Sequence, residues 1–235
     1  MKVIKLIYIC SPYRADTAEE MERNRLAAHK ACEEAYRLGR VTGTQYLPIT
    51  PIGNFPYLDD AKPDERDQAL KLGLSLLSKC DELWVAGDRI SEGMRGEIRA
   101  AVRLEKPVYS MGLGQEKIQT VIAGMEPLLN HKCCFKNSDD RDYKGQLLVL
   151  KASALAPWAR EPENQLWVAS HGFGTNPTAS GRAVFAKCLS DGEEARWNRA
   201  DFYGIANPRR IPDWSKEKLS ELQDQNNEES EESEL

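Results

Sequence analysis

Glu97 is the residue whose type and surroundings best suit covalent chemistry. It follows an apolar run at residues 82–86 and lies on a predicted helix that begins after Gly93. On that helix Glu97 shares its face with Gly93, Gly96 and Ala100, so small side chains leave room for a ligand beside the carboxylate. A carboxylate in such a place can act as a nucleophile. The alternative is a solvent-exposed helix glutamate, the commonest state of this residue type.

Two loops contain groups suited to an anion such as phosphate. Ser11 and Arg14 follow the first apolar run, and residues 88–93 precede the helix of Glu97. A hydroxyl offers one hydrogen bond, a guanidinium offers a charge-assisted pair, and the first amides of a helix attract an anion. The alternative is that Ser11 only starts a turn and that Arg14 is a surface charge.

Alternating strands and helices are predicted around these loops. Strands are expected within residues 3–9, 41–49, 82–86 and 107–111, and helices over residues 17–39, 63–79, 93–104 and 115–129. This alternation indicates a parallel sheet covered by helices, that is, a Rossmann- or flavodoxin-like α/β fold. In such sheets ligands bind at the carboxyl ends of the strands, where both loops are expected.

A different pattern follows the α/β part, which we expect to span residues 1–130. Residues 131–144 are polar and are predicted to be a linker. Short strands at 146–150, 165–169 and 183–189, separated by glycine, proline and asparagine turns, predict a small β-rich domain over residues 145–214. Residues 215–235 are dominated by acidic and polar side chains and are predicted to be a disordered tail.

Composition narrows the functional classes. The net charge of -5 argues against binding to large nucleic acids, which requires a basic surface. No apolar run could span a bilayer and the first residues do not resemble a signal peptide, so we expect a cytoplasmic protein without membrane contacts. The six cysteines contain no C-x-x-C pair and are expected to be reduced, and His131 with Cys133 and Cys134 lacks the second pair of a zinc finger. We therefore expect no metal and no cofactor.

Two motifs carry a family resemblance over about residues 2–125. The stretch from Cys80 to Gly87, followed by the stretch from Ser91 to Ile98, resembles the signature of the nucleoside 2-deoxyribosyltransferase superfamily. The opening stretch from Tyr8 to Arg14 is similar to the first loop of that family. The sequence is most similar to an uncharacterised subgroup, and is also similar to 2'-deoxynucleoside 5'-phosphate N-hydrolases. The C-terminal part faintly resembles an uncharacterised module of bacterial mobile-element proteins.

The resemblance implies roles for individual residues. Glu97 would be the nucleophile that displaces the base from C1' of a 2-deoxyribose, and Asp88 would assist catalysis. Ser91 stands where the N-hydrolases have a phosphate-binding serine, which favours a nucleoside monophosphate. The remaining residues implied to bind substrate are Ser11, Tyr13, Arg14 and Gly93.

One position departs from the family pattern. Many members have, eight residues before the position of Asp81, an aspartate that handles the proton of the leaving base, and this chain has Gly73 there. The alternatives are that Asp88 or Asp67 takes this role, or that base cleavage is lost.

Two functions therefore stand against each other. The first is an enzyme that cleaves the N-glycosidic bond of a 2'-deoxynucleoside or its 5'-monophosphate, or transfers the deoxyribosyl group. The second is a binding module that senses or sequesters a nucleotide and contacts a protein through its β-rich domain. Because family members complete their sites with a neighbouring subunit, the resemblance also implies a homodimer or higher homo-oligomer.

Overall fold

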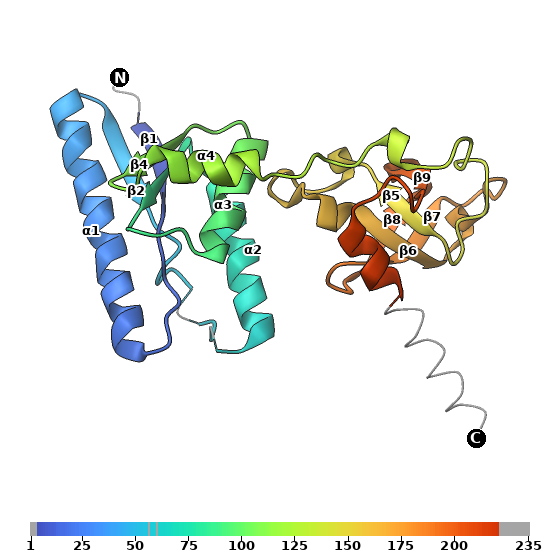
Figure 1. The fold of residues 1–235 in the computed structure, drawn as a ribbon, viewed down its shortest axis with the longest axis horizontal. Helices are drawn as coiled ribbons and strands as arrows, with labels where there is room; N and C mark the ends of the chain where they lie inside the picture. Colours follow the sequence, from blue (N-terminus) through green and yellow to red (C-terminus); the bar gives the residue numbers. More distant parts are fainter. Residues whose placement is uncertain (1–3, 56, 60, 221–235) are drawn as a thin grey trace. The chain divides into compact units, whose positions relative to one another are not determined.

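The chain divides into two compact units, Met1–Met125 and Glu126–Leu235. We analysed a computed structural model, which describes residues 4–55, 57–59 and 61–220 (Figure 1). Within these residues, no helix combines the length and the apolar character needed to cross a membrane.

Unit 1 is built on a four-stranded parallel sheet, which confirms the predicted α/β fold class. Its strands are β1 (Ile4–Cys10), β2 (Gln45–Ile49), β3 (Glu82–Ala86) and β4 (Val108–Met111). The strand order is β2-β1-β3-β4, and each neighbouring pair is parallel. The helices are α1 (Ala18–Thr42), α2 (Pro63–Lys79), α3 (Glu92–Arg103) and α4 (Gln115–Ala123).

Helices cover both faces of this sheet (Figure 1). Because successive side chains of a strand point to opposite faces, Ile7 and Ile9 of β1 pack with α1, whereas Tyr8 and Cys10 pack with α2, α3 and α4. The second of these layers contains the larger cluster, with Leu77, Leu83, Val85, Met94, Ile98 and Ile118 in its core. Tyr8 is thereby directed toward α3, the helix that contains Glu97.

The strand order reverses between β1 and β3, and the chain leaves these neighbouring strands toward opposite faces. Gly87, directly after β3, has φ +100°, and a Cβ there would lie 2.9 Å from Cδ of Pro12 in the loop after β1. Only glycine allows both this backbone conformation and this close approach. The loops after β1 and β3 are therefore packed against each other at the edge where doubly wound sheets bind ligands.

Two predicted helix ends differ from the structure. We expected the first helix to end at Gly39, but α1 continues to Thr42 and is capped by Gly43 at φ 77°. Gly39 therefore does not end the helix. A glycine is needed at this position because a Cβ there would lie 2.6 Å from the carbonyl oxygen of Thr44. The fourth helix, α4, ends at Ala123 and not at 129, and residues 125–130 have no regular secondary structure.

Unit 2 contains a five-stranded antiparallel sheet of order β8-β7-β6-β5-β9. The strands are β5 (Leu147–Leu150), β6 (Leu166–His171), β7 (Ala183–Cys188), β8 (Glu194–Asn198) and β9 (Phe202–Ile205). Six short 3-10 helices connect them: His131–Cys133, Ala152–Ala154, Pro157–Ala159, Pro162–Gln165, Phe173–Thr175 and Arg199–Asp201. Strands β8 and β9 were not predicted, because β8 alternates polar and apolar residues and β9 is only four residues long.

Residues 131–144, predicted to be a linker, are part of unit 2. The side chain of Ser138 is buried and accepts a hydrogen bond from the amide of Ile205 at 2.9 Å. Cys134 forms a β-bridge with Ala206, and Tyr143 is buried in the core against the edge of Phe202. The prediction of a linker was wrong because it rested on polar composition. The polar side chain of Ser138 is bound to the backbone of β9 and not to water.

The start of the predicted disordered tail is also ordered. Residues 213–220 are helical, and Trp214 and Leu219 pack against the second cluster of unit 2. Ser215 is fully buried and donates a 2.5 Å hydrogen bond to the carbonyl of Pro212. Residues 221–235 of the predicted tail lie outside the described residues.

Candidate functional site

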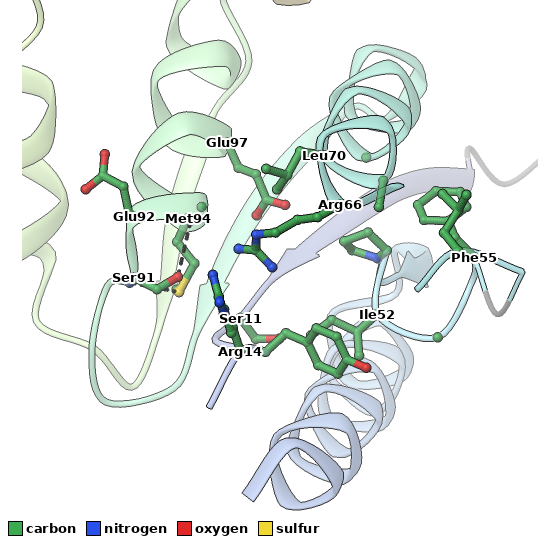
Figure 2. A pocket seen from close by; sticks show the side chains of 17 residues that line it. Ser11, Arg14, Ile52, Phe55, Arg66, Leu70, Ser91, Glu92, Met94 and Glu97 are labelled. Carbon is green, nitrogen blue, oxygen red and sulfur yellow. Dashed lines mark hydrogen bonds between the residues drawn. The ribbon is translucent and has the colours of Figure 1, made fainter. Parts of the chain in front are cut away.

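A cavity of about 520 Å³ opens at the carboxyl ends of the strands of unit 1 (Figure 2). Four segments line it: the loop after β1, the loop after β2, one face of α2, and the N-terminal half of α3. The size is within the range of small-molecule sites. Six of the residues predicted to act in the site line this cavity, namely Ser11, Tyr13, Arg14, Ser91, Gly93 and Glu97.

Glu97 lies on the wall of the cavity in contact with the sheet. The hydroxyl of Tyr8 donates a 2.7 Å hydrogen bond to Glu97 Oε1. Burial raises the pKa of Glu97 above its ordinary value of 4.5, while hydrogen bonds from Cys10 and Tyr8 oppose that rise. Glu97 is therefore a partly desolvated carboxylate oriented by two donors, which is the state expected of a carboxylate used in chemistry.

The two donors to Glu97 keep their own protons. Burial raises the pKa of Tyr8 well above its ordinary value, and the neighbouring Glu97 charge adds to this. Burial also raises the pKa of the Cys10 thiol well above its ordinary value. Both side chains therefore act as hydrogen-bond donors to the carboxylate near neutral pH.

The N-terminus of α3 forms a second wall of the cavity. Ser91 is the N-cap, and its Oγ accepts a 3.4 Å hydrogen bond from the amide of Met94. Gly93 places no side chain over the first turn, where Leu70 is the nearest neighbour to a Cβ at 3.8 Å. The first turn of a 12-residue helix thus faces the cavity, which favours a bound anion.

Arg14 and Arg66 bring two positively charged guanidinium groups to the cavity. Figure 2 shows Arg14 from the loop after β1 and Arg66 from α2 extending toward the space below Glu97. Ser11 lines the cavity from the same loop as Arg14, and its Oγ is buried without a hydrogen-bond partner among the described residues. A phosphate beside Arg14 would meet a charge-assisted donor and the unsatisfied hydroxyl of Ser11.

The remaining wall is mainly apolar. Ile52 is buried, and Phe55 and Leu58 are partly buried in the loop after β2. Leu70 of α2 completes this side. A flat, mostly apolar ring could pack here, with the aromatic face of Phe55 available for stacking.

The two aspartates that we considered for the family's acid do not line the cavity. Asp88 is exposed, and its carbonyl accepts a 3.2 Å hydrogen bond from Lys117 Nζ. Asp67 is on the outer side of α2, where it pairs with Lys71 at 3.1 Å. Gly73 does line the cavity, and a Cβ at that position would lie 3.3 Å from the Tyr8 hydroxyl. Asp88 was predicted to act in catalysis, but in the structure it is exposed and is not among the residues that line the cavity.

Tyr8, Phe55 and Arg66 were not predicted as site residues. Tyr8 belongs to an apolar strand, and such a position predicts a side chain in the hydrophobic core. Arg66 could have been found, because it precedes Leu70 and Gly73 at helical spacing and therefore shares their face of α2. Phe55 had no local signal, since it stands in a proline-rich loop.

The motifs of unit 2 have structural roles in this fold. Arg199 is buried, donates to the carbonyls of Gly174 and Thr175 at 2.9 and 2.7 Å, and stacks on Tyr143 at 3.7 Å. His171 stacks on Phe185 at 4.6 Å. All six cysteines are free, and no group of three metal-ligating side chains occurs among the described residues.

Comparison with known proteins gives two partial matches. Residues 5–111 match a family described as a domain of unknown function (DUF7768). Among solved structures, the chain is similar to a 2-deoxyribosyltransferase from the psychrotolerant bacterium Bacillus psychrosaccharolyticus, at 22% identity and a TM-score of 0.32. That similarity covers 45% of this chain and 70% of the other, and at such a TM-score it carries no argument. No curated protein matches the chain.

The family match ends at residue 111, within unit 1. It therefore gives no information about unit 2. The resemblance of the C-terminal part to a mobile-element-associated module has no support from these comparisons.

Proposed function

We propose that unit 1 cleaves the N-glycosidic bond of a 2'-deoxynucleoside 5'-monophosphate, or transfers its deoxyribosyl group, with Glu97 as the nucleophile. The observation that carries this proposal is the 2.7 Å hydrogen bond from Tyr8 to Glu97 at the wall of a cavity with one cationic and one apolar side. The family resemblance of the motifs around Tyr8 and Glu97 supports the same chemistry.

The geometry supports a covalent first step. Tyr8 holds Oε1 of Glu97, which leaves Oε2 to attack C1' as the bond to the base breaks. The positive charge that develops on the sugar is stabilised by the carboxylate, as in retaining glycosidases. Water or a second base then attacks C1' and releases the Glu97 carboxylate.

The two sides of the cavity suit the two ends of a nucleotide. The 5'-phosphate would lie at the N-terminus of α3, with Arg14 and Ser11 as further donors. The base would lie against Ile52, Phe55 and Leu70. The sugar would then lie between these sides, within reach of Glu97.

A nucleotide-binding module remains the second candidate. It is favoured by Gly73, which places no carboxyl beside the Tyr8 hydroxyl where many family members have an acid. A binding module would hold the nucleotide in the same cavity and leave it intact. The two candidates therefore differ in the release of free base.

The deciding experiment is a base-release assay. The purified full-length protein is incubated with a panel of 2'-deoxynucleosides and their 5'-monophosphates, and free base is measured by chromatography. We expect Glu97→Gln to abolish release and to leave nucleotide binding intact, because the amide has the same shape but is a poor nucleophile. Glu34→Gln, an exposed glutamate of α1, is the matched control and should be fully active. Turnover by Glu97→Gln within a few-fold of wild type would contradict the proposal.

We further propose that the protein forms a closed homo-oligomer, most simply a dimer through unit 1. This rests on the family resemblance alone. Light scattering at concentrations where the protein is active measures the mass directly, and a monomer would contradict it.

A further inference from the structure

Among the described residues that line the cavity, none is a carboxylic acid placed to protonate a leaving base. Among its described lining residues, Glu92 and Glu97 are the only carboxylates. Glu97 is used as the nucleophile in the proposed function. The Glu92 side chain is 80% exposed, pairs with Arg95 at 3.5 Å, and points away from the cavity in Figure 2.

The other proton donors near Glu97 are poor acids. Burial raises the pKa of both Tyr8 and Cys10 well above their ordinary values. The Tyr8 proton is also engaged in the 2.7 Å hydrogen bond to Glu97. Both groups therefore hold their protons tightly, and the geometry offers neither of them as a ready proton donor to a leaving base.

Arg66 brings a permanent positive charge to the cavity, where it can stabilise a leaving base. Arg66 is two helical turns before Gly73 on the same face of α2, and its guanidinium extends into the cavity that Glu97 also lines (Figure 2). A guanidinium stays protonated in proteins, so it cannot donate a proton to a base. It can stabilise negative charge that develops on a group beside it.

We infer that the base leaves as an anion stabilised by Arg66, and that the site is therefore specific for nucleotides of weakly acidic bases of the uracil type. This inference rests on the proposed function. In a uracil-type base the negative charge left on N1 spreads onto both ring carbonyls, and N1 with its neighbouring O2 gives a guanidinium a bidentate acceptor pair. Cytosine has only one ring carbonyl, so its N1 anion is less stable and its departure depends on protonation.

The reaction balances without an acid in the protein. Glu97 Oε2 forms a bond to C1' as the C1'–N1 bond breaks, and the electron pair stays on N1. Water then attacks C1', which releases Glu97 and one proton. The base anion takes up a proton from solvent, so the sum is deoxyribose 5-phosphate and neutral base.

The test is a leaving-group series with the full-length protein. We would measure kcat and KM for 2'-deoxyuridine 5'-monophosphates bearing fluorine, hydrogen or methyl at C5, with 2'-deoxycytidine 5'-monophosphate as the non-imide control. We expect kcat/KM to fall in the order fluorine, hydrogen, methyl, because fluorine makes the base more acidic and methyl less. Release of cytosine should be about 100-fold slower than release of uracil, the size of a missing acid catalyst.

Variants of Arg66 test its role. Arg66→Gln should lower kcat for uracil release about 100-fold, as removal of one oxyanion donor does, and should have a smaller effect on cytosine. Arg66→Lys, which keeps the charge, should recover part of the loss. Arg37→Gln, an exposed arginine of α1, is the matched control and should be unchanged. If Arg66→Gln does not fold, the wild-type substrate series and pH profile decide the question.

The pH profile separates this inference from the proposed function. With N3-methyl-2'-deoxyuridine 5'-monophosphate, whose base has no ionisable proton of its own, kcat should stay level as pH rises from 7 to 9 if no acid group acts, whereas any general acid in the protein would give a falling alkaline limb. Such a limb, or equal rates across the series, would overturn the anionic leaving group and leave the Glu97 nucleophile standing. Absence of base release from every substrate would overturn both proposals.

Discussion

The Tyr8 hydroxyl lies 2.7 Å from Glu97 Oε1 and joins β1 to α3 across 89 positions of the sequence. Tyr8 is fully buried, so its hydroxyl has no access to water. Its hydrogen-bond partner among the described residues is Glu97. Glu97 in turn accepts hydrogen bonds from Tyr8 and from the Cys10 thiol. The pair therefore fixes the orientation of the carboxylate relative to the cavity.

Tyr8→Phe should raise the pKa of Glu97 further, because the hydrogen bond from Tyr8 stabilises the charged carboxylate. A hydrogen bond to a charged group contributes about 1.5–3 kcal/mol, which corresponds to about one to two pH units. The acid limb of the kcat profile should move to higher pH by this amount. Tyr36→Phe, an exposed tyrosine of α1, is the control, and an unmoved acid limb in Tyr8→Phe would show that the bond is absent in solution.

Glu97→Gln should change how stability depends on pH. The pKa of Glu97 is raised in the folded protein, so the folded state binds a proton more tightly than the unfolded state does. Wild-type stability should therefore fall as pH rises from about the ordinary value of 4.5 through the raised value. The glutamine variant lacks this loss and should melt at a higher temperature than wild type near pH 7, with the difference disappearing near pH 4. A constant difference across this range would contradict the raised pKa.

Ser91→Asp should weaken binding of nucleoside monophosphates selectively. Aspartate is as good an N-cap as serine, so the bond to the Met94 amide and the stability of α3 should be kept. The new charge lies beside the proposed phosphate position and should weaken monophosphate binding about 10- to 100-fold, while the unphosphorylated nucleoside binds as before. Calorimetry in the Glu97→Gln background would measure both ligands without turnover. Equal losses for the two would place the phosphate elsewhere.

Gly87→Ala should destabilise unit 1, whereas Gly96→Ala should stabilise it. Gly87 has φ +100° and would place a Cβ 2.9 Å from Pro12, so we expect a loss of about 2 kcal/mol. Gly96 is inside α3 with open space around its Cβ, and alanine there should add about 0.5–1 kcal/mol. Urea unfolding of both variants gives the two signs directly. A neutral Gly87→Ala would show that the loops after β1 and β3 can move apart.

The two units should fold as separate fragments when the boundary follows the structure. A fragment of residues 126–220 keeps Ser138, Tyr143 and Leu219 in the core contacts of unit 2, and it should melt cooperatively. A fragment of residues 145–214, which follows the boundaries expected from sequence, lacks these contacts and should melt at a lower temperature or not fold. A fragment of residues 1–125 should bind nucleotide with the affinity of the full chain. Loss of binding by a folded 1–125 fragment would place part of the site in unit 2.

Local sequence was sufficient for the architecture of unit 1. Strands such as β3 are apolar throughout, and β3 was predicted with the bounds that it has. Helix α2 begins at Pro63 as its sequence indicates, since proline fits the first turn of a helix. These signals are local, because each depends on residues within a few positions of one another. The parallel sheet then followed from the alternation of strands and helices.

Unit 2 was predicted less well for a related reason. Its strand β8 alternates polar and apolar residues over only five positions, and β9 is four residues long. Arg199 and Ser138 are polar, yet they are buried because backbone groups far away in sequence satisfy them. Burial of a polar side chain depends on its partners, and the partners are supplied by the tertiary fold.

By itself, the sequence determined which groups in unit 1 could do chemistry: the glutamate on a small-residue helix face, the helix N-terminus before it, and the serine and arginine after the first strand. Only the tertiary structure decided which of them share one cavity. It placed Arg66 and Glu97 on the walls of one cavity, joined Tyr8 to the Glu97 carboxylate, and left Asp88 out of the cavity lining. The physical reason is that spacing along one element fixes a side chain's face, whereas the approach of two elements is fixed by packing of the whole core.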